Sequence, residues 1–202
     1  MIDNTDIIPP DDPWALFREW YAAARESEPN DPEAMALATV GYDGMPSVRT
    51  VLLKSYDAGG LTFFTNRQSD KGEHLKRHPK AAICFHWKSL RRQVRAEGQV
   101  VPSGDAESDA YFATRPRGSQ IGAWASDQSR PLESREKLQE KLRALEARYE
   151  GKPVPRPSHW GGYRLSPLRM EFWQDREFRL HDRILYHRPG EKAPWVQERL
   201  YP

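Results

Sequence analysis

Apolar residues recur at helical spacing near the start of the chain and then fall into short runs that are typical of strands. Trp14, Phe17 and Tyr21 repeat every three or four residues, so we expect a helix over residues 13–26, with Asp12 as its N-cap. One early helix followed by several short strands favours a fold in which helices surround a sheet.

Short apolar runs bounded by turn residues predict the first strands. These strands are expected at residues 35–41, 48–54, 61–65, 81–87 and 93–101. Asp43-Gly44 is a hairpin signal between the first two strands, and Gly98 suggests a bulge in the last. Between the third and fourth strands, Ser69 can cap a short helix that Pro79 stops.

The second half of the chain predicts two further helices and a final set of strands. Ser103 can cap a helix that ends before Pro116, and leucines at helical spacing predict an amphipathic helix that ends near Gly151. The late strands are expected at residues 163–165, 170–173, 184–187 and 195–200.

The order of these elements predicts the fold class. Hairpin-linked strands with helices between them, without regular β-α-β alternation, favour an α+β fold, mainly β, built around an antiparallel barrel. Residues 1–12 are expected to form a flexible arm and residues 13–202 a single domain. The proline-rich linker at residues 153–157 is followed by too few strands to form a second domain.

Composition narrows the possible partners. The 31 basic and 29 acidic residues nearly balance, so the overall charge gives no reason to expect a nucleic-acid or membrane partner. Cys84 is the single cysteine, which excludes a disulfide within the chain and fits a reducing cytosol. The acidic N-terminus lacks the apolar segment of a signal peptide and no apolar run could span a bilayer, so we expect a cytoplasmic protein.

The usual motifs of several enzyme classes are missing from the sequence. It has no Gly-x-Gly-x-x-Gly, no P-loop and no Gly-x-Ser-x-Gly. His74 and His78 are four residues apart, but neither an acidic ligand nor the glutamate of a zinc-protease motif accompanies them. We therefore expect no metal site.

Several basic residues lie at strand ends, where they could bind phosphate. Lys71 falls just after Ser69, near the start of a short helix, where a lysine and a hydroxyl form either a natural phosphate site or an ordinary exposed surface. Arg49 and Lys54 are an odd number of residues apart, so on a regular strand they would face opposite sides. They would then serve two different ligand groups, or the strand bends between them.

A denser basic motif follows the helix that contains Tyr111. Arg115-Pro116-Arg117-Gly118-Ser119 places two arginines and a hydroxyl close together, one helical turn after Tyr111. Tyrosine, arginine and serine donors converging on one point form the set that a phosphate monoester needs. The alternative is a helix C-terminus that is neutralised by arginines.

The last motif is Glu171-Phe172-Trp173-Gln174 followed by Arg179-Leu180-His181-Asp182-Arg183. Tryptophan can lie against a planar ring system and glutamine can bond to its edge. The spacing alone does not separate such a site from a salt-bridged β-turn.

Together these segments resemble the pyridoxine/pyridoxamine 5′-phosphate oxidase family, and the resemblance extends over residues 12–202. The matching motifs, in order, are Arg49–Lys54, Phe64–Asn66, Arg92–Val94, Arg115–Trp124, Trp160–Arg164 and Glu171–Arg183. The resemblance implies an antiparallel split β-barrel with peripheral helices, and a homodimer with FMN at the subunit interface. It also implies oxidation of pyridoxamine or pyridoxine 5′-phosphate to pyridoxal 5′-phosphate, with O2 as electron acceptor, giving H2O2 and, from the amine, ammonia.

The resemblance also implies roles for individual residues. The cofactor-binding residues would be Arg49, Thr50, Val51, Leu52, Leu53, Lys54, Phe64, Thr65, Lys71, Gln93, Gln128, Ser129, Trp173 and Arg183. The substrate phosphate would be bound by Lys54, Tyr111, Arg115 and Ser119. Arg179 and His181 would lie over the substrate ring as catalytic residues, and Asp31 would lie near the reacting centre.

Three features depart from the family pattern. Asp70 stands where many members have arginine or another non-acidic residue, and an acid there would weaken phosphate binding unless it points to solvent. Phe178 precedes Arg179 where asparagine or histidine is usual. The N-terminal arm is short and lacks the arginine and tyrosine that close over substrate in longer members. These departures bear on affinity and substrate choice more than on the fold.

Two other functions stay open at this point. A related flavin oxidase could act on a phenazine precursor or another flat ring, without needing a substrate phosphate. The complete set of predicted substrate-phosphate residues favours the phosphorylated vitamer instead. A split-barrel protein could also bind flavin without catalysis, and the presence of Arg179 and His181 argues against this.

Overall fold

The computed structural model describes residues 7–202. Within this range the strands are β1 (Ala34–Val40), β2 (Pro46–Leu52), β3 (Ser55–Asp57), β4 (Gly60–Asn66), β5 (Lys80–Trp87), β6 (Arg92–Pro102), β7 (Trp160–Gln174), β8 (Asp182–His187) and β9 (Val196–Arg199). The helices are α1 (Pro13–Ser27), α2 (Asp70–Arg77), α3 (Asp105–Thr114), α4 (Arg117–Ala125) and α5 (Arg135–Arg148), with the 3-10 turn η1 (Glu177–Arg179).

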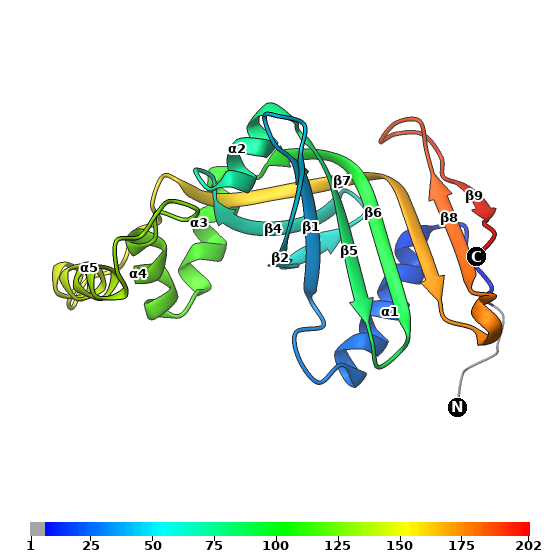
Figure 1. Cartoon of the computed structure of the whole chain (residues 1–202), viewed down its shortest axis with the longest axis horizontal. Coiled ribbons are helices and arrows are strands. Elements are labelled where there is room, and N and C mark those ends of the chain that lie inside the picture. Colours follow the sequence, from blue (N-terminus) through cyan, green and yellow to red (C-terminus); the bar gives the residue numbers. More distant parts are fainter. Residues whose placement is uncertain (1–6) are drawn as a thin grey trace.

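The strands form one antiparallel sheet that curls into a half-barrel, as Figure 1 shows. Their order is β2-β1-β5-β6-β7-β4-β3, and β8 and β9 extend the sheet from β7. β2 is an edge strand, so the backbone groups on its outer side are not used by the sheet. The predicted α+β class and split-barrel architecture are confirmed.

β7 is one strand of 15 residues where the sequence predicted two short ones. Its first half pairs with β4 and its second half with β8, while β6 pairs along both halves. The register shifts between Glu97 and Gly98, which confirms an irregularity at the predicted position, although the extra residue is Leu168 of β7 and not a residue of β6. A proline lacks the N–H of a regular ladder, and the bulge lets the strand continue through it.

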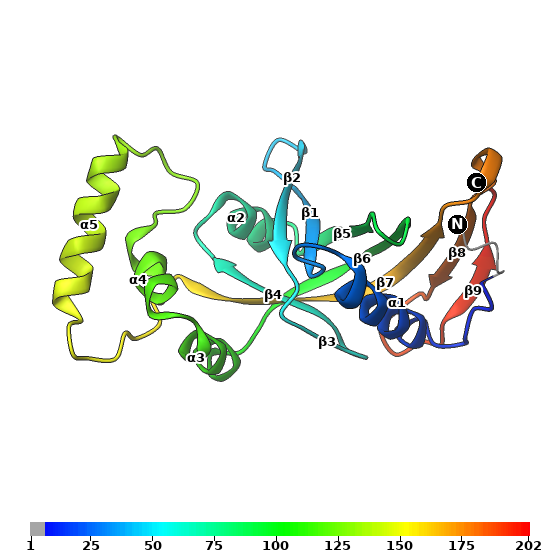
Figure 2. The same cartoon turned by 90° about the horizontal axis from the view of Figure 1, so that it is seen from below.

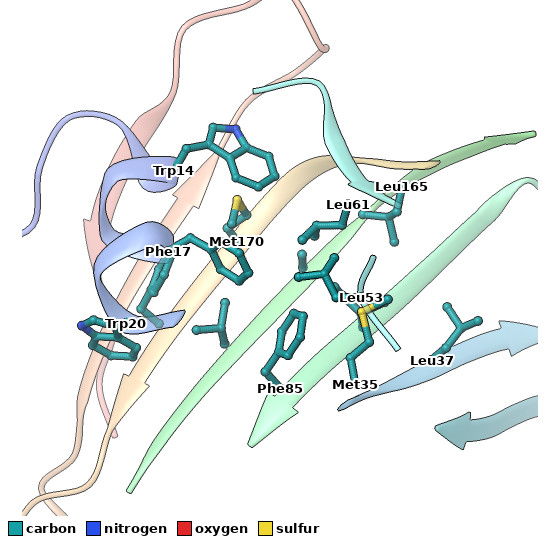
Figure 3. Close-up of a cluster of buried hydrophobic side chains, with 14 of the residues drawn as sticks. Trp14, Phe17, Trp20, Met35, Leu37, Leu53, Leu61, Phe85, Leu165 and Met170 are labelled. Atoms are coloured by element: carbon teal, nitrogen blue, oxygen red, sulfur yellow. The ribbon is translucent and has the colours of Figure 1, made fainter. Parts of the chain in front are cut away.

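The main hydrophobic core lies between α1 and the concave side of the sheet. Phe17 is fully buried, and its ring centroid lies 5.6 Å from that of Phe85 on β5. Trp20 meets Phe172 of β7 edge to face at 5.4 Å. Figure 3 shows these α1 side chains directed at the strands. Asp12 Oδ1 accepts from Trp14 N at 3.0 Å, which confirms the predicted helix start.

A second cluster of buried apolar residues lies under α3, α4 and α5, at the far end of the molecule from β8 and β9 (Figure 2). It comprises Phe112, Ile121, Tyr149, Val154 and Trp160. The sequence analysis did not predict α4, because Pro116 indicated a helix end. In the structure Pro116 is the residue before the first turn of α4, a position that proline tolerates.

The predicted N-terminal arm is described only in part, since residues 1–6 lie outside the described range. The Ile7 carbonyl accepts from Arg199 Nη2 at 2.7 Å, and the Pro10 carbonyl accepts from the Tyr186 hydroxyl at 2.7 Å. Residues 7–12 therefore run along β8 and β9. Among the helices of residues 7–202, none is long and apolar enough to cross a membrane.

Candidate active site

A cavity of about 990 Å³ opens beside the edge strand β2. Its walls come from β2, β4, α2, α3, α4 and the loop after α4, elements that are distant in sequence. The volume is in the range of sites that bind cofactors and drug-sized molecules.

Many of the predicted site residues lie on the wall of this one cavity. They are Arg49, Thr50, Val51, Leu52, Lys54, Phe64, Thr65, Lys71, Tyr111, Arg115, Ser119, Gln128 and Ser129. Leu53, by contrast, has its side chain in the hydrophobic core and its N–H bonded to the Glu33 carbonyl at 2.9 Å. Asp31, Gln93, Trp173, Arg179, His181 and Arg183 are not part of the cavity wall either.

Lys71 anchors one end of the cavity. Its Nζ donates to Gln128 Oε1 at 2.8 Å, Ser69 Oγ at 3.2 Å and Thr65 Oγ1 at 3.3 Å. Burial, and then the positive charge of Arg49, lower the pKa of Lys71 to about 8. The ammonium group is thus held among neutral oxygens, an environment that an anionic ligand would make more favourable.

Arg49 lies at the same end, held by the sheet. Its Nη1 donates to Thr39 Oγ1 at 2.7 Å and to the carbonyls of Ser47 and Leu37, and its Nη2 donates to Ser47 Oγ at 2.8 Å. Burial lowers the pKa of its guanidinium. An arginine has five N–H donors, so its Nε–H and a second Nη2–H can still reach a ligand.

Arg115 and Tyr111 occupy another part of the wall. The Arg115 guanidinium lies 4.7 Å from the ring centroid of Trp160, and burial lowers its pKa. Its Nη1 is buried without a hydrogen-bond partner among residues 7–202. The Tyr111 ring stacks on Phe64 at 4.2 Å. A buried donor that lacks a partner is costly unless a ligand satisfies it.

The structure resolves how Arg49 and Lys54 reach the same cavity. β2 ends at Leu52, and Lys54 N donates to the Thr62 carbonyl of β4 at 2.9 Å. Lys54 therefore lies beyond the strand, where alternation between two faces no longer applies. Both side chains therefore line one cavity, in which each can still serve a different ligand group.

Asp70 also lines the cavity and does not simply point away from it. Its Oδ1 lies 3.5 Å from Arg130 Nη1, and its side chain is 56% exposed. Its negative charge acts on both Lys71 and Arg49, in the direction that raises their pKa. The acid thus lies beside the cationic end, with Arg130 as a partial counter-charge.

The remaining predicted residues form a second group on the neighbouring strands β6, β7 and β8. Gln93 pairs with Trp173, and Trp173 pairs with Arg183. The His181 ring lies 4.6 Å from the Trp173 ring, and Arg183 Nε donates to the buried Glu171 Oε1 at 2.8 Å. This group is on the β8 side of the molecule, apart from α4 along the long axis in Figure 2.

Two predicted catalytic residues have unusual backbone conformations. Arg179 is exposed at the end of η1 and has a φ of 63°, and Phe178 before it has a φ of 56°. Asp31, between α1 and β1, has a φ of 42°. Left-handed conformations are disfavoured for residues other than glycine and cluster at functional sites.

The sequence reasoning did not assign several residues that the structure places at the site, among them Trp160 and Thr39. Trp160 lines the cavity and its ring stacks on that of Phe64 at 5.4 Å. Thr39 accepts a hydrogen bond from Arg49 through its side-chain hydroxyl. Trp160 belonged to a recognised motif, but its place follows only from the pairing of β4 with β7. Thr39 gave no signal, because it lies within an ordinary apolar strand.

The fold and the cavity define a split-barrel protein with clustered cations at a site of cofactor size. The family model described as pyridoxamine 5′-phosphate oxidase matches residues 22–157, and the model of the pyridoxine 5′-phosphate oxidase C-terminal dimerisation region matches residues 160–202. The chain belongs to the pyridoxamine 5′-phosphate oxidase family.

Curated relatives of similar length carry the same description. The chain is 57% identical over 202 residues to a pyridoxine/pyridoxamine 5′-phosphate oxidase of Rhodopseudomonas palustris (strain HaA2), covering 100% of the chain and 95% of the relative. It is 55% identical over 199 residues to the Bradyrhizobium sp. (strain ORS 278) protein of that name, covering 98% and 92%.

Two solved structures share the fold. PhzG from Burkholderia lata 383, in complex with tetrahydrophenazine-1-carboxylic acid, has a TM-score of 0.92 and 34% identity, over 100% of this chain and 99% of that one. A pyridoxamine 5′-phosphate oxidase-related, FMN-binding protein from Nostoc punctiforme PCC 73102 has a TM-score of 0.75 and 20% identity, over 96% and 100%.

Proposed function

We propose that this protein is an FMN-dependent oxidase that converts pyridoxamine or pyridoxine 5′-phosphate to pyridoxal 5′-phosphate. The observation that carries the proposal is the presence of two separate cationic sets on one cavity wall. Arg49 and Lys71 would serve a cofactor phosphate, and Lys54 and Arg115 a substrate phosphate. Relatives at 55–57% identity that are named for this activity support the assignment.

The donors at the first set fit the phosphate of FMN. Lys71, Thr65 and Gln128 already form a hydrogen-bonded group, to which Arg49 adds its free N–H donors. The outer backbone groups of β2, from Thr50 onward, are free to bond the polar edge of a flavin ring, because β2 is an edge strand. The cavity volume accommodates a cofactor with a second ligand beside it.

The second set fits the phosphate of the substrate. Arg115 Nη1 lacks a partner among the described residues, and a phosphate oxygen would satisfy it. Lys54 and the hydroxyls of Tyr111 and Ser119 lie on the same wall. Arginine held against Trp160 loses little freedom on binding, so this arrangement favours a tightly placed phosphate.

A second copy of the chain would complete the site. Trp173, Arg179, His181 and Arg183 all lie within residues 160–202, the segment that matches the dimerisation region, and none lines the cavity of its own chain. A homodimer would bring this group over the partner's cavity.

The sheet offers a surface for such a dimer. On the side away from the α1 core, Ala36 lies opposite Cys84 and Ala38 opposite Ala82, all half-buried. Small side chains on two adjacent strands form a flat face, which another copy can approach closely.

The residues of this chain would bind and orient the reactants. With its phosphate fixed by Arg115 and Lys54, the substrate would have one orientation along the cavity, which is a proximity effect. Arg179 would stabilise negative charge that develops on the substrate ring, and His181 would contact the ring from the same side. FMN, when bound, supplies the hydride acceptor and passes the electrons to O2.

The test is anaerobic reduction of the flavin-loaded protein. Pyridoxine and pyridoxamine 5′-phosphate should bleach the absorption of the oxidised flavin, and their dephosphorylated forms should not. Bleaching by both forms alike would contradict the substrate-phosphate assignment. A flavin-loaded protein that no vitamer bleaches would contradict the proposed activity.

The likeness to PhzG supports one rival substrate class. A tetrahydrophenazine carboxylic acid in the same anaerobic assay would bleach the flavin if the cavity accepts flat rings without a phosphate. The donors on this wall favour the phosphorylated vitamer, because a phosphate monoester offers Lys54 and Arg115 up to two negative charges and three terminal oxygens, whereas a carboxylate offers one charge and two oxygens.

A further inference from the structure

A chain of hydrogen bonds connects Arg49 of the proposed cofactor-phosphate site with the helix that carries Lys71, through residues outside the cavity wall. Arg49 Nη1, from β2, donates to Thr39 Oγ1 on β1 at 2.7 Å. Thr39 Oγ1 is in turn hydrogen-bonded to His74 Nδ1 at 3.0 Å, on the same helix α2 that carries Lys71. We infer that Thr39 and His74 are positioning residues that fix Arg49 relative to Lys71 and so set the affinity for a phosphate monoester. This inference rests on the proposed function.

The Thr39 hydroxyl has an arrangement that satisfies all three groups. Thr39 is 1% exposed, so water cannot replace a missing partner. A hydroxyl has one proton and two lone pairs, and one lone pair accepts from Arg49. Its proton can then donate to His74 Nδ1, so that the hydroxyl, the Arg49 Nη1 and the His74 Nδ1 all have a partner.

The hydrogen bond between Thr39 and His74 links the group around Arg49 to helix α2, which the other contacts of Arg49 do not reach. The Leu37 and Ser47 carbonyls hold the guanidinium on β1 and β2, within the sheet itself. Of the acceptors around Arg49, Thr39 is the one bonded to α2. It therefore couples the strand that carries one cation to the helix that carries the other.

This coupling is needed because the two cations repel. The charge of Arg49 is one of the causes that lower the pKa of Lys71 to about 8. Without a restraint, the repulsion would favour separation of β2 and α2, and part of the binding energy of a phosphate would be used to bring them back. A restraint built into the fold keeps both donors directed at one anion, which is preorganisation of the site.

The experiment compares FMN with riboflavin, which lacks the phosphate, on the full-length protein freed of flavin. Thr39→Val keeps the shape of the side chain and removes the hydroxyl. Loss of one hydrogen bond should raise the Kd for FMN about fivefold to tenfold, measured by flavin fluorescence, and leave the Kd for riboflavin unchanged. Thr39→Ser should retain the wild-type ratio of the two constants. In an Arg49→Ala background, Thr39→Val should add no further loss.

The chain offers a matched control in Thr62, whose buried Oγ1 has no hydrogen-bond partner among the described residues. Thr62→Val should leave the ratio of the two constants unchanged. Equal losses for FMN and riboflavin in Thr39→Val would indicate a packing defect and overturn the inference. If Thr39→Val does not fold, His74→Leu with His74→Asn as the conservative partner makes the same comparison. A wild-type protein without preference for FMN over riboflavin would instead overturn the proposed phosphate site itself.

Discussion

Lys71 is a buried cation at the cavity whose hydrogen-bond acceptors are all uncharged. Its side chain is 8% exposed and bonded to three neutral oxygens. Its pKa of about 8 lies below the ordinary value of 10.5, so between these pH values the unfolded chain binds more protons than the native one. The contribution of Lys71 to the free energy of unfolding therefore rises as the pH increases from about 8 to 10.5.

This linkage predicts the behaviour of Lys71→Met. In the flavin-free protein the variant should have a higher free energy of unfolding than the wild type at pH 7, because a buried charge has been removed. The difference should shrink as the pH rises from about 8 through 10.5, because above 10.5 the wild-type lysine is neutral in both states. Denaturant unfolding of both proteins at several pH values measures it. A difference that does not change with pH would mean that Lys71 is not destabilised by its charge.

Two arginines should give opposite results when each is replaced by alanine. Arg49→Ala should release flavin, because it removes a donor from the cofactor-phosphate group. Arg179→Ala should keep the flavin and lose most of its turnover, because Arg179 is proposed to act on the substrate ring. Flavin content by absorption and turnover with saturating FMN separate the two effects. If both variants retained full colour and activity, the assignment of both residues would be wrong.

Among the helices and strands, local sequence patterns predicted some elements correctly and missed others. Helix α1 and the irregularity at Gly98 followed from local signals, namely a capping residue, helical periodicity and a glycine within a strand. Helix α4 did not, because Pro116 marks a helix start as readily as a helix end. The long strand β7 did not either, since its continuity past Pro167 depends on a bulge at Leu168 in β7 itself, opposite Glu97 and Gly98 of β6.

The close approach of β6 and β7 at the bulge predicts that Gly98 does not tolerate a side chain. A Cβ on Gly98 would lie 2.0 Å from the Ser166 carbonyl oxygen and 2.8 Å from Pro167 Cα, both of them backbone atoms. Gly98→Ala should therefore lower the free energy of unfolding by about 2–3 kcal/mol, measured by denaturant titration. Gly118→Ala in α4 is the control, because nothing lies within 4 Å of the added Cβ and alanine favours a helix. Similar stabilities for the two variants would contradict the close approach of β6 and β7.

At the scale of the whole molecule, the predicted site falls into two groups that one chain keeps apart. The motifs in the sequence identified the residues of both groups. They did not show whether one site takes all of its residues from the same copy of the chain. The cavity wall gathers residues from Arg49 to Ser129, whereas Trp173, His181 and Arg183 lie around β8. The family resemblance implied FMN at a subunit interface, and the separation of the two groups within one chain, together with the match of residues 160–202 to a dimerisation region, supports a site shared between two copies.

A shared site predicts that two inactive variants restore each other. In a mixed dimer of Arg49→Ala and Arg179→Ala chains, one site would have lost both arginines and the other would have both intact. Once free FMN has been removed, so that sites with Arg49→Ala hold no flavin, differently tagged chains purified as a mixed dimer should show about half of the wild-type activity, as one of two equivalent sites is restored. The matched control is a mixed dimer of Arg179→Ala and His181→Ala, in which both mutations lie in the same group and every site is damaged. If each chain built its own complete site, the first mixed dimer would show only the mean of its inactive parents, and the proposed homodimer site would have to be abandoned.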